Sequence, residues 1–169
     1  GKGTLNAGVA TIATSFSTTG AYGLKAVYAG SASFAGSTSV VLSQRVNKAN
    51  SSTALSSSTN PSVAGESVTL TATVTGASPG GTVTFKNGAT TLGTRPLSAG
   101  VATMTRSFAA TGAHSLSAVY AGDTDNHAST SAVLSQTVNA RNATTTALTS
   151  SINPSALAQN PTLTATVTP

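Results

Sequence analysis

The sequence predicts an all-β protein built from repeated β-sandwich units, and three observations support this prediction. The segment 5–46 is repeated at 97–138, with 25 of the 42 aligned positions identical. A second pair of similar segments, 60–74 and 153–167, lies 93 positions apart. A fixed period of this kind indicates a repeat architecture. Apolar residues alternate with hydroxylated ones, as on a half-buried strand. About a third of the residues are Ser or Thr, and threonine suits the solvent face of a sheet.

The period of about 90 residues is the size of an immunoglobulin-like sandwich. Its phase divides the chain into three parts. Residues 1–46 match the back of a unit, 47–138 make one complete unit, and 139–169 match the front of a further unit. We therefore expect tandem immunoglobulin-like β-sandwiches with about seven strands per unit, in a window cut from a longer array.

Short runs separated by turn residues predict the strands of the complete unit in order. The first is 53–55, and it ends before Pro61, because proline cannot donate to a ladder. The clearest is 68–74, in which aliphatic residues alternate with threonines. Asn87-Gly88 is a hairpin signal, since both residues tolerate positive φ. The other predicted strands contain Val83 and Phe85, Leu92, Ala102 and Met104, Leu116 to Tyr120, and Ala132 to Val138.

The same pattern predicts the strands and core of the earlier copy. Its inner-face residues are Ala10 and Ile12, then Leu24, Ala26 and Tyr28, then Val40, Leu42, Gln44 and Val46. Phe16 and Phe108 are predicted to plug one end of the core. Tyr28 and Tyr120 are predicted to cap it, with the hydroxyl bonded to backbone as in a tyrosine corner.

Composition excludes several classes of protein. The chain has no cysteine and no tryptophan, so neither a disulfide nor a Trp pins the sandwich. The net charge is +5, but the basic residues are scattered singly along the sequence, and nucleic-acid binding needs them clustered. No apolar run approaches the roughly 18 residues of a membrane span, and no signal peptide is present in this window.

Residues that could carry chemistry are few. Three acids and two histidines do not suggest an active site, so we expect no catalysis and no cofactor. Asp123 and Asp125 have a D-x-D spacing that can contribute to a calcium site, but the earlier copy has Ser31 and Ser33 there. An ordinary polar turn is the default reading of this segment.

Variable loop positions are the places where a ligand contact is expected. Tyr22 and Phe34 stand opposite His114 and Asn126 in the other copy, so Tyr22, Phe34 and His114 are candidate contact residues. A carbohydrate-binding module would present a row of exposed aromatics. One or two such residues do not make that platform.

The framework motifs resemble a known family. The segments 60–74, 81–88 (Gly-Thr-Val-Thr-Phe-Lys-Asn-Gly), 97–103 and 114–123 look like the bacterial Ig-like repeat domain. The resemblance covers essentially all of the chain, as one full copy and two partial ones. It implies tandem arrays in large surface or secreted bacterial proteins, and it transfers no catalytic or binding residue.

These observations lead to two expectations about function. The first is a non-catalytic structural repeat of an extracellular bacterial stalk, adhesin or filament. The alternative is a module that binds a glycan or a protein, accessory to a secreted enzyme. The expected partners are neighbouring Ig-like units of the same or an identical chain, in a head-to-tail fibre, because an ordered half sandwich needs a complement for its apolar face and open strand edges.

Overall fold

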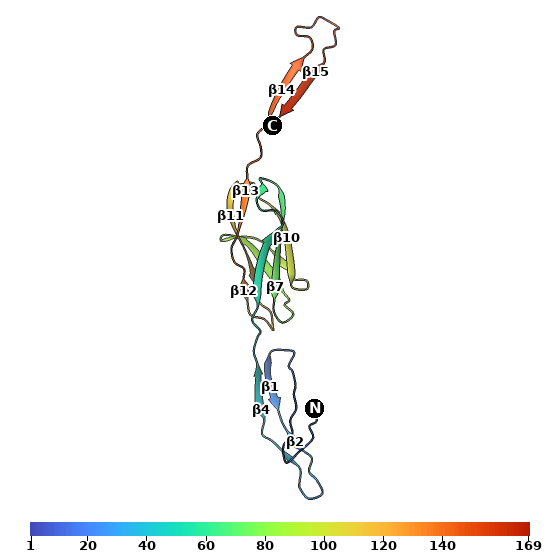
Figure 1. Ribbon diagram of the computed structural model, residues 1–169, viewed down its shortest axis with the longest axis vertical. Coiled ribbons are helices and arrows are strands. Elements are labelled where there is room, and N and C mark those ends of the chain that lie inside the picture. Colours follow the sequence, from blue (N-terminus) through green and yellow to red (C-terminus); the bar gives the residue numbers. More distant parts are fainter.

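The computed structural model describes all residues, 1–169. It contains strands and no helix, and therefore no helix that is long and apolar enough to span a membrane. Figure 1 shows three bodies arranged end to end: an N-terminal part, a central β-sandwich and a C-terminal hairpin.

The central unit contains the seven predicted strands and two additional strands of two residues each. The seven are β5 (Ser52–Ser57), β7 (Ser67–Thr75), β8 (Thr82–Asn87), β9 (Thr90–Pro96), β10 (Val101–Ser107), β11 (Gly112–Tyr120) and β13 (Leu134–Asn139). The two short ones are β6 (Ser62–Val63) and β12 (Ser129–Thr130). The predicted hairpin turn lies between β8 and β9 but is shifted by one residue: Asn87 ends β8 and pairs with Thr90, so the turn is formed by Gly88, at a φ of 56°, and Ala89.

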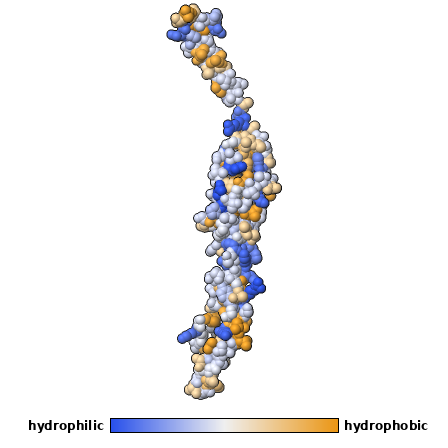
Figure 2. Space-filling model, turned by 180° about the vertical axis from the view of Figure 1, so that it is seen from behind, coloured by the Kyte–Doolittle hydropathy of each residue, from blue (hydrophilic) through white to orange (hydrophobic).

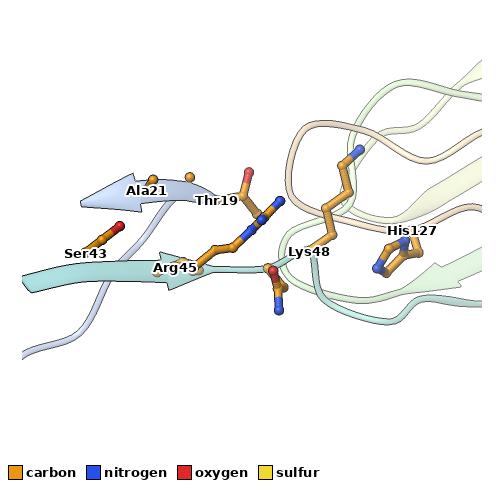
Figure 3. A pocket seen from close by; sticks show the side chains of 9 residues that line it. Thr19, Ala21, Ser43, Arg45, Lys48 and His127 are labelled. Carbon is orange, nitrogen blue, oxygen red and sulfur yellow. The ribbon is translucent and has the colours of Figure 1, made fainter. Parts of the chain in front are cut away.

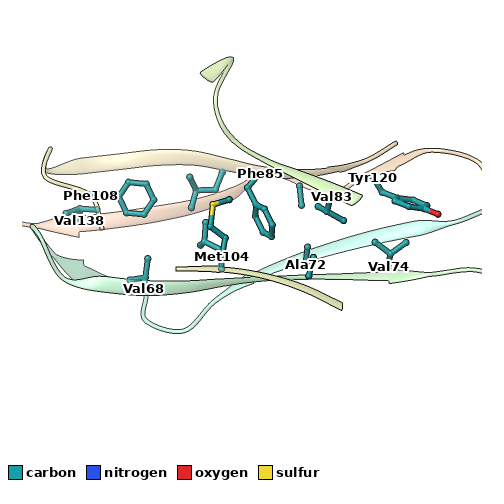
Figure 4. Close-up of a cluster of buried hydrophobic side chains, with 13 residues drawn as sticks. Val68, Ala72, Val74, Val83, Phe85, Met104, Phe108, Tyr120 and Val138 are labelled. Carbon is teal, nitrogen blue, oxygen red and sulfur yellow. The ribbon is translucent and has the colours of Figure 1, made fainter. Parts of the chain in front are cut away.

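Two sheets pack face to face in this unit. One has the strand order β10-β7-β5, and the other β6-β13-β11-β8-β9, with β12 paired to β11. Alternate residues of each strand point inward because the side-chain period of a strand is two. Figure 4 shows the resulting core, which contains Val68, Leu70, Ala72, Val74, Val83, Phe85, Ala102, Met104, Phe108, Leu116, Ala118, Tyr120 and Val138. This is an immunoglobulin-like β-sandwich without a disulfide.

The prediction of a tyrosine corner at Tyr120 is wrong. The ring is buried, but the hydroxyl makes no hydrogen bond to backbone. It lies beside the Asp123 carboxylate, and burial together with this neighbour raises the Tyr120 pKa to about 12. The neighbour that sequence reasoning missed is thus a carboxylate three residues further along the chain.

The N-terminal part forms fewer strands than predicted. It contains β1 (Gly20–Leu24), β2 (Val27–Tyr28), β3 (Ser37–Thr38) and β4 (Leu42–Val46). Residues 10–18, which include the predicted inner-face Ala10 and Ile12, form no strand. Their counterpart β10 pairs with β7, and the N-terminal part has no equivalent of β7. The predicted strand fails because its pairing partner is not there.

The C-terminal hairpin repeats the register of the central unit. Thr145 pairs with Thr168 and Ser150 with Leu163 in β14 (Thr145–Ser150) and β15 (Leu163–Thr168), as Ser52 pairs with Thr75 and Ser57 with Leu70 in β5 and β7. Its inner face is uncovered, however: Leu163 is 64% exposed, whereas Leu70 is 0% exposed. Figure 2 shows apolar residues at the surface of this hairpin and of the N-terminal part.

A matched pair of truncations tests this difference in burial. Leu70→Ala should lower the free energy of unfolding of the central unit by about 2–5 kcal/mol, because it opens a cavity in a close-packed core. Leu163→Ala, the same change at the equivalent position, should alter it by less than about 0.5 kcal/mol. Denaturant unfolding at low protein concentration measures both. Equal losses in the two variants would contradict the structure.

Candidate functional site

The loop between β11 and β12 is organised around the Asp123 carboxylate. Its Oδ1 accepts hydrogen bonds from the backbone N–H groups of Asp125 (2.9 Å) and Asn126 (2.7 Å), and its Oδ2 from the N–H of Gly80 (2.8 Å). The hydrogen bond from Gly80 is the main cause that holds the Asp123 pKa well below its usual range, although burial opposes it. The carboxylate thus ties the loop to the β7–β8 connection.

Asn126 adds a second tie and is completely buried. Its side-chain Oδ1 accepts from the N–H of Ala77 at 2.7 Å, and its Nδ2 donates to the Ala77 carbonyl at 3.0 Å. The amide therefore pairs with both backbone groups of one residue, as a neighbouring strand would.

The same loop holds the segment that joins the N-terminal part to the central unit. Ala49 donates its N–H to the Asp125 carbonyl (2.7 Å) and accepts from the N–H of His127 (2.9 Å). Lys48 Nζ donates to the Asp123 carbonyl, and Ser51 Oγ to the His127 carbonyl. The linker is therefore bonded to the central unit rather than free.

Thr19 bonds the body of the N-terminal part to this loop. Its N–H donates to Asp125 Oδ1 and its Oγ1 to the Thr124 carbonyl, each at 3.0 Å. These two bonds span more than 100 residues of sequence, so the D-x-D segment has a role that its spacing alone did not reveal. We call Thr19, the linker 47–51 and the loop 123–127 the joint.

The calcium alternative for Asp123 and Asp125 can be compared with this geometry. The oxygens of Asp123 point at N–H donors, and one oxygen of Asp125 accepts from Thr19. No group of three or more His, Asp or Glu residues gathers anywhere in the structure as metal ligands. The arrangement is that of a polar turn that fixes two segments of chain.

An open cleft with a basic lining lies at the joint. Its nine residues include Arg45 of β4, Lys48 of the linker and His127 of the central loop, and none of the nine is acidic. Figure 3 shows Arg45 and His127 reaching toward the joint from the two units, with Lys48 between them. This cluster could not be predicted from the sequence, because its members come from separate segments.

Tyr22 and His114, two of the candidate contact residues, each form a hydrogen bond and a ring contact within their own unit. Tyr22 Oη donates to the carbonyl of Thr18 (2.8 Å), and His114 Nε2 donates to that of Ala110 (2.9 Å) at the equivalent position. Each ring also packs on a phenylalanine, with ring centroids 4.5 Å apart for Phe16–Tyr22 and 4.7 Å apart for Phe108–His114. Tyrosine and histidine thus serve one structural purpose in the two copies.

Phe34, the third candidate contact residue, lies in the loop between β2 and β3 and is 71% exposed. Its counterpart Asn126 is buried against the β7–β8 connection, which the N-terminal part lacks. The Phe34 ring forms no ring pair with Tyr22 or His114, whose rings pack on Phe16 and Phe108 instead.

The Asp123 pKa shift predicts how stability depends on pH. A carboxyl whose folded pKa is depressed contributes stability above its unfolded value of 3.8, and this contribution is lost as the pH falls toward the folded pKa. The wild type should therefore exceed Asp123→Asn in denaturant midpoint at about pH 7, and the difference should shrink below about pH 4. Midpoints measured at neutral and acidic pH give the comparison. A difference that stays constant across this range would show that the ionised carboxylate does not stabilise the fold.

Comparison with known proteins places the central sandwich. No curated protein matches the sequence. A solved structure, the fibronectin(III)-like modules of Clostridium thermocellum CbhA, is similar at 25% identity with a TM-score of 0.41. The match covers 56% of this chain and 50% of that chain, so the present chain spans about half the length of that structure.

A family model gives a more specific result. The model described as bacterial Ig-like domain (group 3) matches residues 55–139. This range is just over half of the chain and contains all seven long strands of the central sandwich, apart from the first residues of β5. The family supplies structural or binding modules. On this match, the chain belongs to the bacterial Ig-like domain family (group 3).

Proposed function

We propose that this chain is a non-catalytic structural repeat of an extracellular bacterial surface protein, a spacer within a stalk, adhesin or filament. The observation that carries the proposal is the joint, in which Thr19 of one unit bonds to the same loop that holds the linker of the next. Membership of a family common in surface and secreted proteins supports the location.

The joint suits a spacer because it limits the motion of one unit against the next. A free linker of a few residues would leave the angle between units open, whereas this linker is hydrogen-bonded through Lys48, Ala49 and Ser51. The loop that receives it is in turn fixed to Gly80 and Ala77 of its own unit. Bending at the joint would therefore break several hydrogen bonds together.

A matched pair of substitutions at Asp125 tests the joint. Asp125→Ala removes the side-chain acceptor for the Thr19 N–H, while Asp125→Asn keeps an oxygen at the same place. Both variants keep the Asp125 carbonyl that receives Ala49. We expect small-angle scattering of the 169-residue chain to show a broader range of inter-unit orientations for Asp125→Ala only. If the wild type already showed as broad a range of inter-unit orientations as Asp125→Ala, the hydrogen bond from Thr19 to Asp125 would not restrict motion between the units.

We further propose that the two incomplete parts are covered by complementary halves of neighbouring units, head to tail. The hairpin β14–β15 has the register of β5–β7, and β1–β4 repeats the pairing of β11 with β13, as Gly20↔Val46 repeats Gly112↔Val138. In the central unit these two halves belong to the two sheets that face each other across the core. Each half exposes the apolar surface that the other would cover.

Self-association of the chain tests this coverage between identical molecules. Leu163→Asp places a charge on the inner face of β15, and Thr166→Asp places the same charge on its opposite face, because successive side chains alternate. In sedimentation velocity we expect a concentration-dependent oligomer that Leu163→Asp weakens at least about tenfold, since a buried unpaired charge is costly. Thr166→Asp should retain it. A wild-type chain that stays monomeric at high concentration would argue against head-to-tail coverage.

A further inference from the structure

We propose that the cleft at the joint binds carboxylate groups of an acidic polysaccharide, a chain of uronic-acid sugars. This function goes beyond that of a spacer, and it would attach the array to an anionic glycan at a point between two units. The proposal rests on a polar cleft that both units line and that has Arg45, Lys48 and His127 among its lining residues (Figure 3).

The charge of the lining is unusual for this chain. The sequence has eight Lys and Arg and two His, and Arg45, Lys48 and His127 line this one cleft. The nearest acids are Asp123 and Asp125 of the loop, and neither is a lining residue. Asp123 is bonded to Gly80 on its own unit, and Asp125 to the N–H of Thr19. Both loop carboxylates therefore accept hydrogen bonds from backbone N–H groups, and neither forms an ion pair with Arg45.

Two of the three basic side chains have no partner within the chain. Arg45 and His127 enter hydrogen bonds only through their backbone groups, and no ion pair engages either side chain. Lys48 differs, because its ammonium group donates to the Asp123 carbonyl. The Arg45 guanidinium thus keeps its planar set of N–H donors free, and this geometry matches the two oxygens of a carboxylate.

The rest of the lining favours a sugar over a peptide. Ser43 contributes a hydroxyl and Asn47 an amide to the lining, and such groups can form hydrogen bonds with sugar hydroxyls. The only hydrophobic side chains are those of Ala21 and Val46, so the cleft offers no apolar pocket of the kind that anchors a protein or peptide partner. A polar, hydroxylated chain that bears carboxylates is the ligand class that fits this lining.

Binding of polygalacturonate to the full 169-residue chain, at about 0.15 M salt to screen diffuse attraction, tests the proposal. Arg45→Gln should weaken binding at least about tenfold, because it removes a charge-assisted bidentate contact. The matched control is Arg95→Gln, which makes the same charge change at an exposed position on β9, away from the cleft. It should leave the affinity within about twofold. Lys48 is left intact, because it also holds the joint.

Every other outcome would overturn the proposal. Absence of binding to polygalacturonate, or an equal loss in Arg45→Gln and Arg95→Gln, would remove the cleft as a specific site. Poly-glutamate bound as tightly, with the same dependence on Arg45, would make the ligand an acidic peptide. Equal binding of dextran sulfate would deny selectivity for carboxylates. Thermal unfolding and scattering of Arg45→Gln should match those of the wild type, which separates a loss of ligand from a disturbed joint.

Discussion

The structure depends on one constraint: the apolar face of each sheet must be covered by a second sheet. With no disulfide and no tryptophan, the central unit is held by aliphatic and aromatic packing between two sheets and by their backbone ladders. Where both sheets are present, the inward-facing residues of β7, such as Val68 and Leu70, are buried. Where one sheet is present, the same residues at equivalent positions are exposed, as Leu70 and Leu163 show. The sequence of a strand sets its pairing, but its burial depends on the half that faces it.

The joint depends on the same core through one loop. Asp123 and Asn126 bind the loop to the β7–β8 connection, and the outer side of this loop receives the linker and Thr19. A carboxylate that accepts several N–H donors is stabilised in its ionised form, so the charge of Asp123 both fixes the loop and resists protonation. The joint therefore depends on the sandwich, because the linker and Thr19 bond to a loop that the central unit holds in place.

The sequence was sufficient for the framework and insufficient for the contacts between segments. The alternation at 68–74 predicted β7, and Asn87-Gly88 predicted the β8–β9 turn. Both succeeded because the side-chain period of a strand and the residue preferences of a turn depend only on neighbouring residues. The failure at Ile12 has the opposite cause, since a strand needs a partner and none lies beside it. The two copies have the same alternating pattern here, so the pattern alone could not show that the pairing strand is absent from one of them.

The candidate site shows the same limit more strongly. The basic cleft joins Arg45 and Lys48 to His127, about 80 positions away, and only the docking of the linker onto the loop brings them together. The equivalence of Tyr22 and His114 was hidden because the two side chains look chemically different, yet each donates to the carbonyl four residues earlier. Their variation suggested a ligand contact, which stays a prediction; in the structure two different rings make the same hydrogen bond.

Variation between copies therefore has a structural meaning at the joint as well. The framework residues of the loop region, such as the Ala-Val-Tyr-Ala-Gly run at 26–30 and at 118–122, are the same in both copies. The next residues differ: Asp123, Asp125 and Asn126 correspond to Ser31, Ser33 and Phe34. A serine supplies no carboxylate to collect the N–H groups of a loop, and Ser31 Oγ accepts from a single N–H, that of Ser33. In an array of such units, the sandwich would be constant from repeat to repeat, while a few loop residues set how firmly each unit is held to the one before it. A repeat protein can in this way vary its stiffness along its length without altering the core that makes it fold.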